Sequence, residues 1–374
     1  MRFPEFSGEW KCTTIGNIGD IKNGPFGSVL HAEDYVENGI PIVTTEHFKT
    51  GLMPSDKFGI PQVSNEDYIR LKGYRLETND IVFSRVGSVD INAHVGIEQN
   101  GWLFSGRVLR VRPKYDIDSL FLHYALSTEA VKRDIRNRAV GQTMPSINTP
   151  ILFCTTIQLP KDLFEQKKVA HFLRLLDERI ITQNKIIEKL QSLIKGLRVC
   201  CMQRVYGNNV YLSEIAQIYQ PQTISSTELT EDGFLVYGAN GIIGKYKDYN
   251  HETEQICITC RGNTCGMVNY TKPMSWITGN AMVINTDKYQ DKVCKRYLYH
   301  YLSAYNFNSI ISGSGQPQIV RTPLEKLKIT LPTISEQKQK AIIFDKIQDK
   351  IDINHKVLNL YIGQKQYLLR QMFI

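Results

Sequence analysis

Two long stretches of the chain carry apolar residues at alternating steps of four and three. The first stretch begins at Val169 and the second at Phe344. This spacing is a heptad seam, which predicts helices that pair along a narrow apolar stripe rather than helices lying on a broad core. We expect helices over 165–201 and 336–372, each about 55 Å long at about 1.5 Å per residue.

A carboxamide interrupts each seam at the midpoint of its helix, Gln183 in the first and Asn354 in the second. If the helices pair antiparallel, the two amides face one another, and a buried amide pair fixes helix register at some cost in stability. The alternative is that both are solvent-facing positions of a degenerate seam. Tyr361 and Lys365 also fall in the second seam, so we expect the last turns of that helix to pair loosely.

The helices are the best-kept part of an internal duplication. Upstream of them the match is weaker and its separation drifts, as loops of different length produce on a common scaffold; here Gly106 aligns with Gly279 and Arg85 with Arg261. Three motifs recur at a nearly constant separation: Gly141-Gln142-Thr143-Met144-Pro145 with Gly313-Ser314-Gly315-Gln316-Pro317, Leu159-Pro160 with Leu331-Pro332, and Glu165-Gln166-Lys167 with Glu336-Gln337-Lys338.

The duplication divides the chain into two globular segments, each followed by a helix. β-rich stretches bounded by Gly and Asn turns, together with a short helix before each Gly-Pro loop, predict an α+β fold in both segments. The expected parts are a globular segment over 1–160, a spacer helix over 161–205, a second globular segment over 206–333 and a second spacer helix over 334–374. The expected strands are Ile81–Phe83, Val108–Val111, Ile256–Thr259 and Ala281–Ile284, and the expected short helices are 118–139 and 291–305.

Composition and charge indicate a folded protein of two domains and the kind of partner that it binds. A chain of 374 residues with 42% hydrophobic and 10% aromatic residues suits two folded domains. The formal net charge of +8 favours a polyanionic partner, although many proteins without one share it. The apolar runs are too short for a membrane span and the start lacks the layout of a secretory signal, so we expect a cytoplasmic protein with reduced cysteines.

Polar side chains cluster where the predicted strands run into loops. Arg, Lys, Asn and Thr are side chains that hydrogen-bond base edges and phosphates, although each is also an ordinary loop residue. Arg85 and Arg261 are the strongest candidates, because an arginine ends a strand in both copies. The candidate DNA-binding residues are Lys22, Asn23, Thr44, Thr45, Arg85, Arg107, Asn240, Lys245, Arg261, Asn263 and Thr264.

Arg110 and Arg112 alternate along a predicted strand and, with Arg107, form a basic stripe in the first copy. The corresponding residues of the second copy are uncharged, so the stripe is not part of the common scaffold. Two interpretations remain open: the stripe contacts phosphate in one half-site, or it is a solvated face of the sheet.

Several kinds of chemistry find no support in the sequence. Cys257, Cys260 and Cys265 invite a zinc site, but no fourth ligand stands at a standard spacing, and we interpret them as buried thiols. Gly244-Lys245 lacks the preceding glycine of a phosphate-binding loop, and the chain has no Pro-Pro dipeptide of the kind found in amino-methyltransferase motifs. We therefore expect no catalytic residue, no metal and no cofactor on this chain.

The layout resembles the specificity subunits of type I restriction-modification systems over essentially the full chain. The features that carry the resemblance are the opening Phe3-Pro4-Glu5-Phe6-Ser7-Gly8-Glu9-Trp10, the Gly-Gln-Pro-type loops, the Leu-Pro then Glu-Gln-Lys at each helix start, and the duplicated order of segments and helices.

The resemblance implies that each globular segment is an α/β target recognition domain that reads one half of a bipartite, asymmetric DNA sequence. The two helices would pair as an antiparallel coiled coil, hold the spacing between the halves and dock two methyltransferase subunits. S-adenosylmethionine, ATP and Mg would be bound by the methyltransferase and restriction (translocase) subunits. A methyltransferase contact could also lie at the loosely paired end of the second helix.

Two other classes of function remain open from the residues alone. One is a non-catalytic coiled-coil scaffold whose globular ends bind a protein or a ligand, for which DNA binding would be absent or insensitive to salt. The other is a hidden enzyme such as a zinc-dependent nuclease, which metal analysis would detect.

Overall fold

The structure is a computed structural model that describes residues 2–25, 30–114, 116–203, 205–239, 241–313 and 315–373. The chain forms two compact units: unit 1 combines Met1–Thr182 with Leu358–Ile374, and unit 2 is Gln183–Val357. Each unit therefore contains one globular segment and a part of both long helices. The predicted parts are consecutive along the chain, whereas the boundary between the two compact units falls within each long helix.

Both predicted long helices are present, as α6 (Leu163–Gln203) and α9 (Ile334–Met372). Asp162 precedes α6 and its Oδ1 accepts the amide of Phe164 at 2.8 Å. At the start of α9, Thr333 and Glu336 form a reciprocal capping box, in which each side chain accepts the other's backbone amide. The caps explain why each helix begins just after a Leu-Pro pair.

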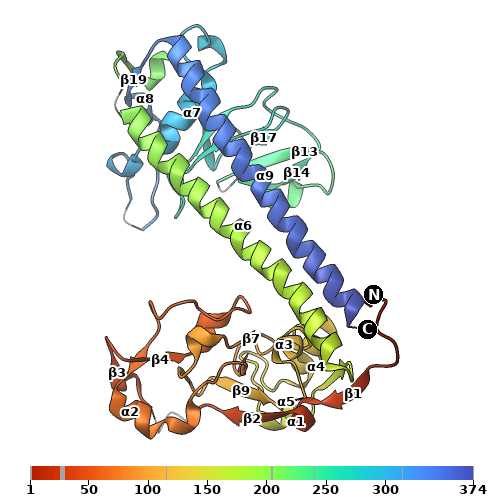
Figure 1. Cartoon of the computed structure of the whole chain (residues 1–374). Coiled ribbons are helices and arrows are strands. Elements are labelled where there is room, and N and C mark those ends of the chain that lie inside the picture. Colours follow the sequence, from red (N-terminus) through yellow and green to blue (C-terminus); the bar gives the residue numbers. More distant parts are fainter. Residues whose placement is uncertain are drawn as a thin grey trace. The chain divides into compact units, whose positions relative to one another are not determined.

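In unit 2, the end of α6 and the start of α9 lie side by side in opposite directions (Figure 1). Gln183 Nε2 donates to the side-chain and backbone oxygens of Asn354, and Lys340 Nζ donates to the carbonyl of Cys201 at 3.2 Å. Residue numbers thus rise along one helix as they fall along the other, which confirms the antiparallel pairing. Gln183 is only 8% exposed, so the predicted contact between the two amides exists, and its role in register stays a prediction.

In unit 1, the last turns of α9 are packed, and the expectation of loose pairing there is wrong. Lys365 Nζ binds Asp177 on α6, and Arg179 lies over the ring of Tyr361. Leu368 beyond them is buried in the core of the unit. The polar seam residue is compatible with close packing because a carboxylate on the facing helix neutralises it.

Unit 1 contains a four-stranded sheet in the order β2-β9-β6-β7, a second in the order β3-β5-β4-β8 and the pair β1-β10. Its strands are β1 (Lys11–Thr14), β2 (Gly19–Asn23), β3 (Tyr35–Val36), β4 (Ile40–Val43), β5 (Gln62–Val63), β6 (Ile81–Ser84), β7 (Asn92–His94), β8 (Leu103–Phe104), β9 (Val108–Pro113) and β10 (Thr156–Leu159). Its further helices are α1 (Ile15–Ile18), α2 (Asn65–Arg70), α3 (Ser119–Leu126), α4 (Glu129–Arg138) and α5 (Thr149–Phe153).

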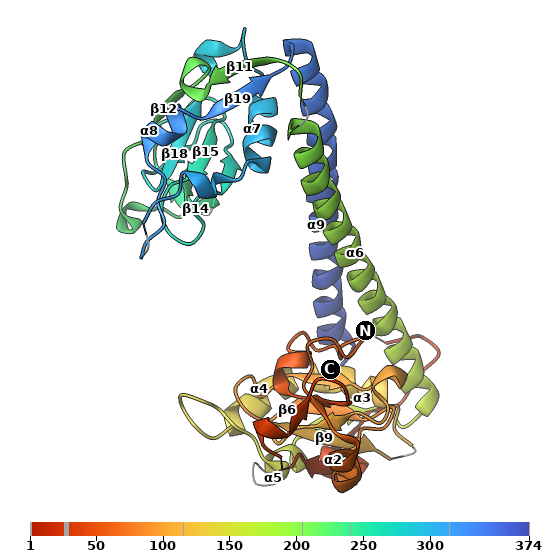
Figure 2. The ribbon, with the colours of Figure 1, turned by 90° about the vertical axis from the view of Figure 1, so that its left-hand side faces the viewer.

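Unit 2 repeats this plan, with the sheet β12-β18-β15-β16, the sheet β14-β13-β17 and the pair β11-β19. The strands are β11 (Asn208–Tyr211), β12 (Gln217–Tyr219), β13 (Phe234–Gly238), β14 (Gly241–Tyr246), β15 (Ile256–Thr259), β16 (Val268–Tyr270), β17 (Trp276–Ile277), β18 (Ala281–Asn285) and β19 (Lys328–Leu331). The helices are α7 (Lys295–Ala304) and α8 (Arg321–Glu325), and α7 lies between the first sheet and the long helices (Figure 2).

The central strands are buried on both faces. In β6, Ile81 and Phe83 face the core shared with α3 and the long helices, whereas Val82 faces the second sheet. In β15, Ile258 and Cys257 divide in the same way. Burial on both faces explains why these strands appear in the sequence as continuous apolar runs, and the strands predicted at β6, β9, β15 and β18 are confirmed.

The helix expected over 118–139 is two helices, α3 and α4, and the prediction of one continuous helix is wrong. Ser127 Oγ donates to the carbonyl of His123, and Thr128 Oγ1 donates to the carbonyl of Ala125, each at 2.8 Å. These hydroxyls occupy carbonyls at the end of α3 and favour a break over continued helix.

The repeated Glu-Gln-Lys motif has a structural explanation in its glutamine. Gln166 Oε1 accepts the amide of Asp118, which caps α3, and Gln166 Nε2 donates to Pro160, both at 2.9 Å. Gln337 makes the same pair of bonds at the start of α7, to Cys294 and Pro332. The buried amide thus ties each long helix to the short helix of its globular segment.

We expect the change Gln337→Ala to lower the free energy of unfolding of unit 2 by about 2 kcal/mol, because a buried amide and a buried carbonyl lose their partners. Urea denaturation of the full chain measures the loss, and Gln339→Ala, at an exposed position of the same helix, is the matched control. Equal stability of the two variants would show that the glutamine contributes nothing beyond its helix position.

Candidate nucleic-acid interface

In unit 1, the ends of three strands meet at the loop Ser105–Arg107, which leads into β9. The amide of Gly24, after β2, donates to Val108 at 3.0 Å, and the amide of Ser105 donates to Val43 at the end of β4 at 2.9 Å. A Cβ at Gly24 would lie 1.9 Å from the Ser105 carbonyl oxygen, so this approach requires glycine. The segment Lys22-Asn23-Gly24 owes its glycine to this contact.

The predicted residues of the first copy gather around this loop. Arg85 follows β6, donates its amide to Arg107 at 2.9 Å and donates Nη1 to Gly106 at 3.1 Å. Arg107 is exposed, and Asn23 ends β2 one position beyond Lys22. We call Asn23, Thr44, Thr45, Arg85 and Arg107 the first edge cluster. Lys22 lies beside it, with its Nζ over the ring of Tyr74.

Thr44 and Thr45 are held at the end of β4 by a short 3-10 helix, Thr45–Phe48, whose last residue is buried. The amide of Thr44 donates to Nδ1 of His47 at 3.1 Å. Burial lowers the pKa of His47, against the opposing effect of the neighbouring Glu46 charge. The ring is therefore neutral near pH 7 with its proton on Nε2, which makes His47 a further donor beside the first edge cluster.

In unit 2, the loop before β18 has the same connections. The amide of Thr278 donates to Tyr237 in β13 at 3.0 Å, and the carbonyl of Asn280 accepts the amide of Cys260 at 3.2 Å. Arg261, Asn263 and Thr264 follow β15 directly, and we call these three residues the second edge cluster. Each copy therefore places its polar loop residues at the equivalent edge of its own sheet.

The alignment of Arg85 with Arg261 is wrong by one residue. The backbone amide of Arg85 donates to the carbonyl of Arg107, and the amide of Cys260 donates to the equivalent carbonyl, that of Asn280. The side chains correspond as well: Arg85 donates to the carbonyl of Gly106, and Cys260 donates to the carbonyl of Gly279 at 3.7 Å. Arg261 is thus the counterpart of Val86, and successive residues of extended chain face opposite sides. The shift could not be recognised in the sequence because the loops of the two copies differ in length. As a result, Arg261 is exposed, whereas Arg85 is half-buried and faces the other side of the strand.

Two candidates of the second copy lie outside the second edge cluster. Lys245 sits four residues into β14, opposite Leu235, and its Nζ contacts Asp232 at 3.3 Å. At about 3.3 Å per residue it is about 13 Å along the strand from Gly241, where β14 begins two residues after Ala239, whose carbonyl accepts from Thr259 at the end of β15. Asn240 lies outside the described residues.

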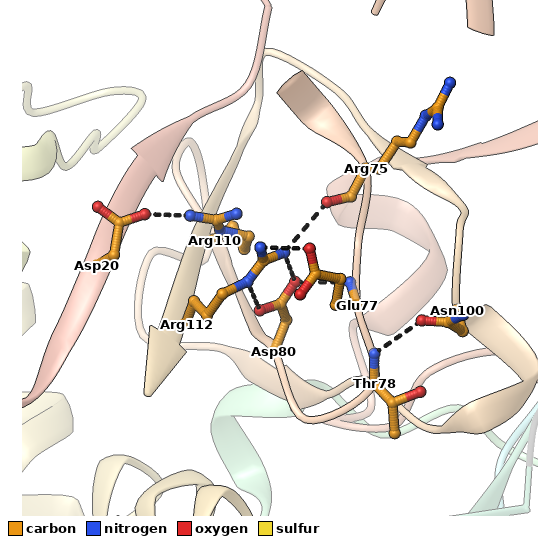
Figure 3. A network of polar contacts seen from close by, with 8 residues as sticks. All are labelled: Asp20, Arg75, Glu77, Thr78, Asp80, Asn100, Arg110 and Arg112. Atoms are coloured by element: carbon orange, nitrogen blue, oxygen red, sulfur yellow. Dashed lines mark hydrogen bonds and ion pairs between the residues drawn. The ribbon is translucent and has the colours of Figure 1, made fainter. Parts of the chain in front are cut away.

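Two residues of the basic stripe, Arg110 and Arg112, are bound by carboxylates. Arg110 is 4% exposed and binds Asp20, while Arg112 donates to both carboxylate oxygens of Asp80, at 2.7 and 2.8 Å, and to Glu77 (Figure 3). Hydrogen bonding to Asp80 raises the pKa of Arg112, whereas burial lowers that of Arg110. The solvated-face interpretation is therefore wrong for Arg110, and carboxylates from other segments bind both arginines, whereas a phosphate contact of the exposed Arg107 stays a prediction.

The recurring Gly-Pro loops, which mark the duplication in the sequence, lie next to the edge clusters. The amide of Gly87, just after Arg85, donates to Pro145 at 2.8 Å, and the amide of Gly262 donates to Pro317 at 3.0 Å. Their tips are exposed, at 141–144 in the first copy and at Gly315 and Gln316 in the second. Their repetition beside two strand ends was the signal that could have marked them as site residues.

The cysteines of unit 2 are arranged as thiols rather than as a metal site. Cys257 and Cys260 are buried, and burial raises the pKa of both thiols. Across the described ranges no group of three or more His, Cys, Asp or Glu side chains is placed to hold a metal ion. In the same ranges, no helix combines the length and apolar character needed to cross a membrane.

Comparison with known proteins gives one consistent result. The family model described as type I restriction modification DNA specificity domain matches residues 7–192 and 208–360. The type I restriction enzyme EcoprrI specificity subunit of Escherichia coli is 31% identical over 147 residues, which cover 38% of this chain and 36% of that protein. The MjaVIII specificity subunit of Methanocaldococcus jannaschii is 25% identical over 410 residues, covering 95% of this chain and 89% of that protein.

The fold is similar to a solved structure as well. The crystal structure of a type I restriction-modification S subunit from M. genitalium matches with a TM-score of 0.66 and 17% identity, over 100% of this chain and 99% of the other. At this identity the likeness concerns the fold, namely two α/β domains joined by long helices.

Proposed function

The chain belongs to the family of type I restriction modification DNA specificity domains, and we propose from this that it selects the DNA target of a type I restriction-modification complex. Each globular segment is a target recognition domain for one half of a bipartite, asymmetric sequence. The observation that carries the proposal is that each unit has an equivalent sheet, and that the two units present different polar residues at the equivalent edge of that sheet.

The first and second edge clusters suit contact with a DNA duplex. Their exposed arginines, Arg107 and Arg261, are side chains that donate to guanine edges or to phosphates, and the threonines and asparagines add donors and acceptors. The net charge of +8 agrees in sign with a polyanion. Because the clusters differ in residues while the scaffold is shared, the two half-sites should differ in sequence.

The remaining functions of the complex are assigned to other subunits. We propose that two methyltransferase subunits dock on the long helices and bring S-adenosylmethionine, and that restriction subunits supply the chemistry that needs ATP and Mg. This chain then binds no cofactor and carries no catalytic residue. Its contribution is to place the enzymes on the chosen sequence.

We expect Arg107→Ala and Arg261→Ala to weaken discrimination in different half-sites, each by about tenfold or more, because an arginine that reads a base contributes about 1–3 kcal/mol. The measurement is the methylation rate of the complete methyltransferase complex on duplexes in which one half-site at a time is randomised.

Lys245→Ala is the control for a lost surface charge, since Lys245 lies away from the second edge cluster, and it should leave both half-sites unchanged. If each arginine variant altered both half-sites, or neither, the assignment of one reader to each half would be overturned.

A further inference from the structure

In unit 1, a half-buried polar contact joins the globular segment to both long helices. Tyr124 on α3 donates its hydroxyl to Asp177 Oδ2 on α6 at 2.8 Å, and Lys365 on α9 donates to Asp177 Oδ1 at 2.5 Å. Lys365 Nζ also lies 5.4 Å from the centre of the Tyr124 ring. We call Tyr124, Asp177 and Lys365 the first clamp.

In unit 2, a contact of the same kind is built from other residues. His300 on α7 is fully buried; its Nε2 lies 2.7 Å from Asp345 Oδ1 on α9, and its Nδ1 lies 2.9 Å from Arg198 Nη2 on α6. Because Arg198 can only donate, the neutral ring accepts at Nδ1 and donates from Nε2 to Asp345. We call His300, Asp345 and Arg198 the second clamp, and Arg296 adds a further bond to Asp345.

The two clamps have the same plan. Tyr124 and His300 occupy corresponding places on the short helix, as the recurring leucines on either side of them show. In each unit the acid stands on the long helix that follows the globular segment and the cation on the other long helix. The acids and cations do not align in the helix repeat, so the same three-way contact is made twice from different positions.

A polar contact of this kind does something that the surrounding apolar packing cannot. Apolar contacts are nearly non-directional, whereas charge-assisted hydrogen bonds fix an angle and a distance. A rotation of the globular segment about the helices would leave the buried hydroxyl or ring nitrogen, and the half-buried acid that it binds, without a partner, which is costly.

We propose that the two clamps orient each target recognition domain on the helix pair and thereby determine how strictly the complex selects the spacing between the half-sites. The inference rests on the proposed function. The residues of the clamps are positioning residues: they contact no base and act through the orientation of the edge clusters. A change of one base pair in the spacer moves a half-site by about 3.4 Å and rotates it by about 35°. A loosely held domain can follow the displaced half-site and still bind it, whereas a rigidly held domain cannot.

The test uses Lys365→Met and Arg198→Met in the complex with its methyltransferase subunits. Methylation rates are measured on duplexes with the native spacer and with one base pair more or less. We expect the ratio of native to altered spacers to fall by about tenfold in each variant, the size of one charge-assisted hydrogen bond, while the bases required in each half-site stay the same. Lys365→Arg, which keeps the charge, should restore selectivity.

Tyr124→Phe gives a milder second test because it removes a single hydroxyl, and Asp352→Asn, an exposed partner of Gln348 on α9, is the matched control. A lower melting temperature with unchanged spacer selectivity in the Met and Phe variants would overturn the inference and leave the proposed function standing. If the unaltered protein itself showed no bipartite target, the proposed function would fail, and the inference with it.

Discussion

Replacing Asp80 with alanine is expected to cost unit 1 about 3–5 kcal/mol of its free energy of unfolding, which is a large part of the stability of an ordinary domain. Asp80 is 1% exposed, and its carboxylate accepts hydrogen bonds from Nε and Nη2 of Arg112 (Figure 3). It also accepts the backbone amide of Glu77 at 2.7 Å. Its removal leaves that amide and the buried Arg110 without their central negative charge.

The loss is measured by urea denaturation in a Trp276→Phe background, where fluorescence reports on Trp10 and Trp102 of unit 1. Adding Arg112→Met should recover part of the stability, since an apolar replacement of a whole ion pair is often tolerated. Glu129→Gln, in an exposed pair with Arg136, should have little effect. Equal losses for Asp80→Ala and Glu129→Gln would contradict the structural role of the network.

Inserting one heptad into each long helix, after Thr182 in α6 and after Val357 in α9, is expected to lengthen the DNA spacer by about three base pairs. Seven residues add about 10.5 Å of helix and preserve the heptad seam, and B-DNA rises about 3.4 Å per base pair. Methylation at the native spacing should be lost and should reappear at the longer one, with the same two half-sites.

The readout is again the methylation rate of the complete complex, on duplexes with graded spacers. A heptad added to α6 alone is the control, and it should destabilise the protein because the two seams no longer match. Retention of the native spacing by the double insertion would show that the helices do not set the distance.

The sequence predicted the elements whose signal is local and repeated. The heptad seams located α6 and α9 to within two residues at their starts, and the amide midpoints Gln183 and Asn354 were placed together correctly. The central strands and the duplicated plan were also predictable, because continuous apolar runs and recurring glycine motifs depend little on tertiary context.

The errors fall where a distant partner decides the environment of a residue. No residue near Arg112 or Lys365 in the sequence indicates that Asp80 or Asp177 is its partner. The half-buried ion pair was therefore interpreted as a basic stripe, and the packed seam as a loose one. The alignment of Arg85 with Arg261 failed because a shift of one residue in an extended strand is invisible to composition but reverses the side chain.

The measurement that tests the central claim most directly is sequencing of adenine methylation across the genome in cells with and without this protein, its partner subunits being present in both. The account predicts one bipartite, asymmetric motif with a fixed spacer that is methylated only when the protein is present. Methylation that is the same in both cells, or that follows a single uninterrupted motif, would contradict it.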